Sequence, residues 1–117
     1  MLHRLQISRT LYLTSRLAGI GYYSRNHREI LVESLRALRD PDPWVVAGGL
    51  HNIGHLARRF GIVDWPLVRA AERAVFNRPY NRNIHFALND MRSDIANYMP
   101  FKKRLANLDF ERRHGDG

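Results

Sequence analysis

The chain of 117 residues contains no cysteine, which excludes disulfides, thiolate nucleophiles and cysteine-ligated metals. Lysine occurs only at positions 102 and 103, so arginine supplies almost all of the positive charge. Acidic residues are missing from the first 27 positions. No apolar run is long enough to cross a bilayer, because the longest candidate, residues 44–57, is interrupted by His51, Asn52 and His55. The sequence therefore favours a small domain without a membrane span.

Charge is distributed unevenly along the chain. The formal net charge is +8, and half of it lies in residues 1–27, which hold four arginines and no acid. The rest of the chain is only mildly basic, whereas a nucleic-acid interface needs a concentrated basic face. The length suits one domain, whose modest core would benefit from a partner surface.

Residues 1–27 have the composition of a mitochondrial transit peptide. On a helix, leucines alternate with arginines in a roughly amphipathic pattern, formed by Leu2, Arg4, Leu5, Arg9, Leu11, Leu13 and Arg16. The alternative is an ordinary basic N-terminal helix of a cytosolic protein. We expect three regions: this segment, a helical domain over residues 28–100, and a charged tail over residues 101–117.

Apolar spacing predicts four helices after the N-terminal segment, over residues 28–39, 43–60, 65–76 and 83–99. The turn 40–43 contains two prolines, Gly61 suits a helix C-cap, Asp64 suits an N-cap, and Pro100 ends the last helix. No stretch alternates between apolar and polar residues, which makes a sheet improbable. The expected fold is all-α: a small bundle of about four helices, or stacked helical hairpins.

The predicted helix 43–60 contains two features that need a reason. Gly48, Gly49 and Gly54 each cost about 1 kcal/mol relative to alanine inside a helix, so either another helix or a lipid approaches closely, or the helix is kinked. His51 and His55 lie four residues apart and could bind zinc only with a third ligand. Their other interpretation is a pair of polar residues at the edge of the apolar face.

Arginines gather around the middle of the sequence, and Arg58, Arg59, Arg78 and Arg82 are candidates to hold anionic lipid head groups or RNA phosphates. A solvated, partly paired face is the simpler interpretation of these arginines.

Trp44 and Trp65 each begin a helix beside a proline, and we expect them to pack at helix ends rather than to line a pocket. No arrangement of Ser, His and Asp indicates a catalytic triad.

Two family resemblances can be stated. Residues 38–56, with an Asp-Pro turn before a Val- and Ala-rich helix, resemble a single HEAT-type hairpin. Residues 59–100 resemble the helical 14 kDa subunit of ubiquinol–cytochrome c reductase. The matching positions are Gly61, Ile62, Asp64, Val68, Arg69, Ala71, Arg73, Val75, Tyr80, Asn81, Met99 and Pro100. The linker is shorter and the C-terminal segment differs. The second resemblance implies a supporting role without catalytic residues.

We therefore expect a non-catalytic subunit of a mitochondrial inner-membrane energy complex, either a respiratory complex or ATP synthase, on the matrix side. It would bind other protein subunits and no cofactor, metal or small-molecule substrate. The expected interface anchors are aromatic: Phe60, Trp65, Phe76, Tyr80, Tyr98 and Phe101. The alternative is an RNA-contacting protein of the mitochondrial ribosome, and a free-standing enzyme or metal protein is a third hypothesis.

Overall fold

A computed structural model describes residues 2–98. This part of the chain is all-helical and contains five helices: α1 (Leu2–Tyr23), α2 (His27–Leu38), α3 (Pro43–Phe60), α4 (Trp65–Phe76) and α5 (Arg82–Tyr98). The all-α prediction is confirmed. The predicted bounds of α3 and α4 are the observed ones. Helix α2 begins and ends one residue earlier than predicted, α5 begins one residue earlier, and its predicted end at residue 99 lies outside the described residues. The predicted tail lies outside the described residues.

Local capping chemistry sets the helix ends. The Asp42 side chain accepts a hydrogen bond from the backbone N–H of Trp44 at 2.9 Å, and Asp64 does the same for Leu67 at 2.9 Å. Gly61 ends α3 in the left-handed conformation, with φ of 63°. There its N–H donates to the carbonyl of Ala57, and the N–H of Ile62 donates to Leu56. The sequence signals for these three ends are therefore confirmed.

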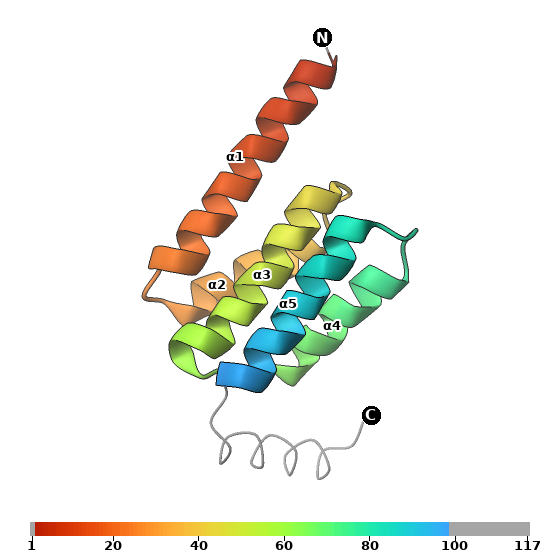
Figure 1. Ribbon diagram of the computed structural model, residues 1–117. Coiled ribbons are helices and arrows are strands. Elements are labelled where there is room, and N and C mark those ends of the chain that lie inside the picture. Colours follow the sequence, from red (N-terminus) through yellow and green to blue (C-terminus); the bar gives the residue numbers. More distant parts are fainter. Residues whose placement is uncertain (1, 99–117) are drawn as a thin grey trace.

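The helices form two layers (Figure 1). Helices α1, α3 and α5 run in the same direction in one layer, while α2 and α4 run back behind them. Helix α3 is central, because it packs on all four of the others. The main core consists of apolar residues from α2 to α5. The largest fully buried ones are Ile30, Val46, Leu50, Leu56, Val75, Ile84, Leu88 and Met91.

Helix α1, predicted as a basic leader, packs on this unit. Leu17 is buried in a second cluster with Ala37 and Val45. Arg9 and Arg16, two of the arginines that suggested a targeting segment, form ion pairs of 2.7 Å with Asp40 and Glu33. The hydrogen bond from Arg16 lowers the pKa of the Glu33 carboxyl, and Arg9 does the same for Asp40. Within the described residues no helix is long and apolar enough to span a membrane.

The glycines of α3 are sites of close helix approach. A Cβ on Gly48 would lie 3.1 Å from a methyl carbon of Leu17 in α1, and a Cβ on Gly49 would lie 2.8 Å from the Cβ of Ala37 in α2. A Cβ on Gly54 would lie 2.5 Å from the carboxylate of Asp94 in α5. The expectation that neighbouring helices offset the cost of these glycines is confirmed, and α3 runs through them as one helix.

Candidate functional site: a cleft between three helices

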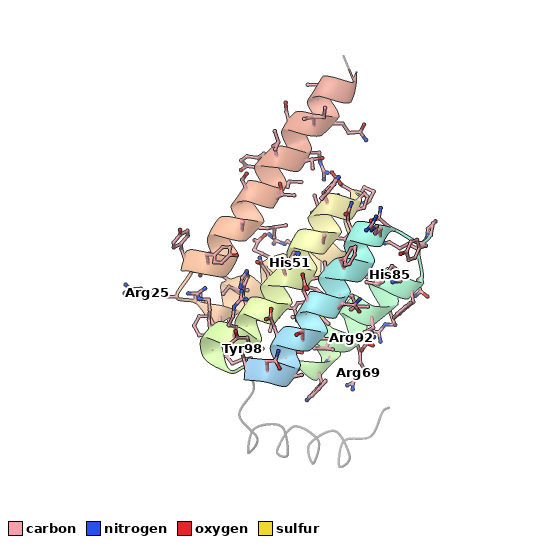
Figure 2. The ribbon with its side chains drawn as sticks, in the orientation of Figure 1. Arg25, His51, Arg69, His85, Arg92 and Tyr98 are labelled. Carbon is pink, nitrogen blue, oxygen red and sulfur yellow. The ribbon has the colours of Figure 1, made fainter. Side chains whose placement is uncertain are left out.

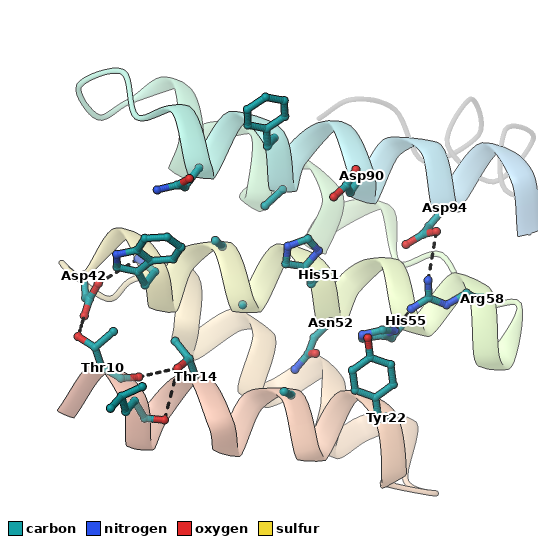
Figure 3. A pocket seen from close by; sticks show the side chains of 18 of the residues that line it. Thr10, Thr14, Tyr22, Asp42, His51, Asn52, His55, Arg58, Asp90 and Asp94 are labelled. Carbon is teal, nitrogen blue, oxygen red and sulfur yellow. Dashed lines mark hydrogen bonds and ion pairs between the residues drawn. The ribbon is translucent and has the colours of Figure 1, made fainter. Parts of the chain in front are cut away.

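A cleft of about 1240 Å³ lies between α1, α3 and α5 and is here named the α1–α3–α5 cleft (Figure 3). Its α1 wall is one face of the helix, formed by Gln6, Ile7, Thr10, Leu11, Thr14, Ala18 and Tyr22. The start of α3 and the residues on its outward face form the floor, which includes Asp42, Trp44, Gly48, His51, His55 and Arg58. The α5 wall contains Asn83, Phe86, Ala87, Asp90, Ser93 and Asp94. The cleft therefore depends on segments far apart in the sequence.

One end of the cleft is apolar and open to solvent. Trp44 is 56% exposed, Phe86 is 54% exposed and Leu11 is 61% exposed. Ile7 belongs to the same group. Large apolar side chains that stay exposed together in a concave surface are typical of interaction sites rather than of solvated faces. The expectation that Trp44 would not line a pocket is wrong, because the neighbouring α1 wall makes its ring part of a cleft.

The other end of the cleft is polar, and most of its groups are paired. Arg58 lies 3.5 Å from the Asp94 carboxylate and also contacts the Nδ1 atom of His55 (Figure 3). The ring of Tyr22 packs against His55 with centroids 4.5 Å apart. Asp90 has no hydrogen-bond or ion-pair partner within the described part of the chain, and it is exposed on the α5 wall.

The two candidate zinc histidines differ in environment. His51 is exposed in the cleft, whereas His55 is only 5% exposed. Burial lowers the pKa of His55 to about 4, and the nearby positive charge of Arg58 adds to this effect. Among residues 2–98 there is no group of three His, Cys, Asp or Glu side chains arranged to hold a metal ion. The described residues therefore offer no third ligand for this pair.

Three of the four candidate phosphate-binding arginines have partners within the fold. Arg59 donates to the backbone carbonyls of Gly21 and Ser24 at 2.6 Å each, so it caps the C-terminal end of α1. Arg78 donates to the carbonyls of Ala74 and Asp40 at 3.0 and 3.2 Å. Arg58 has the partners given above. Arg82 is exposed and lies over the ring of Phe86, 5.3 Å from its centroid.

The predicted aromatic anchors do not form one surface. Phe60 and Trp65 are partly buried and pack against the core, so they stabilise the fold itself. Phe76 and Tyr80 are exposed, and each packs against the ring of His85, with centroid distances of 5.7 and 4.6 Å. Tyr98 is exposed at the end of α5 (Figure 2). Phe101 lies outside the described residues.

Six residues that line the cleft were not predicted as site residues, whereas Arg58 was; the six are Ile7, Leu11, Tyr22, Phe86, Asp90 and Asp94. A signal existed, because Phe86 is a large aromatic residue off the apolar seam of α5. However, no local pattern shows which helices flank it.

Comparisons with protein-family models, with curated proteins and with solved structures gave no match. Function must therefore be argued from the cleft.

Proposed function

We propose that this chain is a non-catalytic subunit of a larger assembly, and that the α1–α3–α5 cleft receives a segment of another protein. The observation that carries the proposal is the set of exposed apolar side chains at one end of this cleft, Leu11, Trp44 and Phe86. Aromatic and aliphatic anchors in a concave site contribute most of the binding energy of protein interfaces. Proteins built from stacked helix pairs also use one layer of helices as a binding surface.

Three titratable groups of the cleft, Asp42, Asp94 and His55, are engaged in contacts within the fold, whereas Asp90 and His51 are exposed. Asp42 caps α3 and accepts a hydrogen bond from Thr10, and Asp94 pairs with Arg58. His55 is enclosed by Tyr22 and Arg58. These contacts hold the helices together, so the same groups are poorly placed to transfer protons to a bound substrate.

The proposal also includes a cellular location for the protein. The acid-free, arginine-containing start of the chain and the resemblance of residues 59–100 support a place on the matrix side of the mitochondrial inner membrane. There the protein would support a respiratory complex or ATP synthase through contacts with other subunits. Among the four candidate arginines, Arg82 is the one that is exposed and has no hydrogen bond or ion pair within the described residues, so it is the best placed of these to meet an anionic lipid head group.

Native-gel fractionation of an affinity-tagged full chain in its native cells tests the proposal. Wild-type protein should migrate with a high-mass complex, and mass spectrometry should identify its partners. Phe86→Ser should lose this association because Phe86 lies in the cleft, whereas Tyr23→Ser should keep it because Tyr23 is 82% exposed and lies outside the cleft. A wild-type chain found only as a monomer would contradict the proposal.

The RNA-contacting alternative has one observation in its favour. Arg82 and the exposed rings of Tyr80 and Phe86 form an aromatic and cationic surface at the start of α5. Such surfaces stack on unpaired bases. RNA affinity that falls steeply as salt rises, and that Arg82→Gln weakens, would support this function over protein docking.

A further inference from the structure

The α1–α3–α5 cleft is acidic although the chain is basic. The whole chain has a formal charge of +8. The charged side chains that line the cleft are three carboxylates, Asp42, Asp90 and Asp94, and one guanidinium, Arg58. With histidines counted as neutral, the formal charge of the lining is −2. The local charge therefore has the opposite sign to that of the molecule.

The carboxylate of Asp90 in α5 is the one available to a ligand. Asp90 is exposed and has no partner within the described residues, whereas Asp94 is already paired with Arg58. Asp90 and Asp94 lie four residues apart, so they are neighbours on the same face of α5. A cation placed beside Asp90 would compensate its charge, and in a concave, partly desolvated site the attraction is stronger than on an open surface.

The length of the cleft corresponds to that of a short helix. Its α5 wall runs from Asn83 to Asp94, which corresponds to about 16 Å, or about three helical turns. A helix of about three turns would therefore lie along the whole of this wall.

The walls of the cleft also favour a helical occupant over an extended one. All three walls are helices, whose backbone groups are already bonded internally. An extended peptide would find no unpaired sheet edge in these walls, so its backbone N–H and C=O groups would depend on scattered polar side chains or stay unpaired at a cost in free energy. A helix satisfies its own backbone and presents only side chains.

We propose that the occupant is one amphipathic α-helix of another protein, about three turns long. A lysine or arginine side chain of this helix faces Asp90, and its apolar side chains contact Leu11, Trp44 and Phe86. This inference rests on the docking function proposed above and specifies the chemistry of the partner.

The test uses two synthetic 18-residue peptides with the same leucine positions at helical spacing. One carries lysine at every polar position and the other carries glutamate. The full chain with Trp65→Phe retains Trp44 as its only tryptophan, and Trp44 lies in the cleft. This substitution removes an indole N–H that is buried without a partner in the described residues. Titration of Trp44 fluorescence then reports occupancy of the cleft directly.

The lysine peptide should bind about tenfold more tightly than the glutamate peptide, with a change in Trp44 emission. Binding to the basic surface of the chain would instead favour the glutamate peptide, because the net charge is +8. The order of the two affinities therefore shows whether the peptide binds in the cleft or elsewhere on the surface. Asp90→Lys should reverse the preference. Glu29→Lys makes the same charge change on the exposed start of α2, outside the cleft, and should leave the preference unchanged.

Equal binding of the two peptides, tighter binding of the glutamate peptide, or an Asp90→Lys variant that keeps the wild-type preference would overturn the inference. So would a dimer of the full chain that Asp90→Lys dissociates, since a second copy would then occupy the cleft. If the protein enters a high-mass complex in cells but binds neither peptide, this inference fails and the proposed function stands. If it binds the lysine peptide but enters no complex in cells, the proposed role as an assembly subunit is wrong, and the preference of the cleft for a basic helix is supported.

Discussion

The guanidinium of Arg59 in α3 donates a 2.6 Å hydrogen bond to the backbone carbonyl oxygen of Gly21 in α1. A second bond of the same length reaches Ser24. The last carbonyls of a helix have no partner within the helix, so one side chain of α3 satisfies the end of α1. This contact ties the N-terminal helix to the centre of the fold, 38 residues further along the chain.

Arg59→Ala should lower the free energy of unfolding by about 2 kcal/mol, because hydrogen bonds from a charged donor are lost and two carbonyls lose their partner. Urea denaturation followed by circular dichroism measures this change. Arg25→Ala is the matched control, since Arg25 is exposed at the α1–α2 connection. Equal stability of the two variants would show that Arg59 contributes nothing to the attachment of α1.

Gly49→Ala and Gly19→Ala should have opposite effects on stability. The new Cβ at position 49 would lie 2.8 Å from that of Ala37 and 3.1 Å from the carbonyl oxygen of Ser34. This overpacking should destabilise the protein by about 1–3 kcal/mol. A Cβ at position 19 would meet nothing within 4 Å, so only the gain in helix propensity remains, up to about 1 kcal/mol. Thermal unfolding of both variants checks the signs, and a stabilised Gly49→Ala would show that α2 and α3 are not in close contact.

His55 should make stability fall as the pH decreases from neutral. Its folded-state pKa is lowered to about 4 by burial and by Arg58, whereas an unfolded histidine has a pKa of about 6.5. The unfolded chain therefore binds more protons between these values, and the contribution, complete above about pH 6.5, is lost as the pH falls towards about 4. Urea midpoints between about pH 7 and 5 should decrease less in His55→Gln than in wild type.

A chain that begins at Ser24 should be less stable than the full chain. It would lose the burial of Leu17, worth about 1.5–3 kcal/mol for a leucine, and would expose the faces of Ala37 and Val45 that Leu17 covers. The expected results are a lower urea midpoint and increased binding of a hydrophobic dye. Identical midpoints would indicate that residues 1–23 are dispensable for folding, as a removable leader would be.

Several features of this fold could be predicted from the sequence because their causes are local. The helix ends at Asp42, Gly61 and Asp64 follow from side-chain capping and backbone conformation within a few residues. The buried seam of α5, from Ile84 to Ile95, follows from helical periodicity. The close approach of helices at Gly49 was also predictable, since a glycine inside a helix needs compensation.

The placement of individual functional groups was less predictable because it depends on contacts distant in sequence. Arg59 and Arg78 look like surface cations in the sequence, but each reaches a carbonyl 38 residues away. Phe60 and Trp65 look like interface anchors, yet they pack on the protein's own core. No local pattern distinguishes a side chain that meets its own fold from one that meets a partner.

The sequence by itself determined the helical class, the ends of α3 and α4, and the buried seam of α5, since these depend on periodicity and on neighbours within one or two turns. Only the tertiary structure decided that α1 packs against α3 and that α1, α3 and α5 enclose an acidic cleft with Trp44 and Phe86 at one end. The physical reason is that a cleft arises from the relative positions of helices, which are set by long-range packing such as that at Gly48, Gly49 and Gly54.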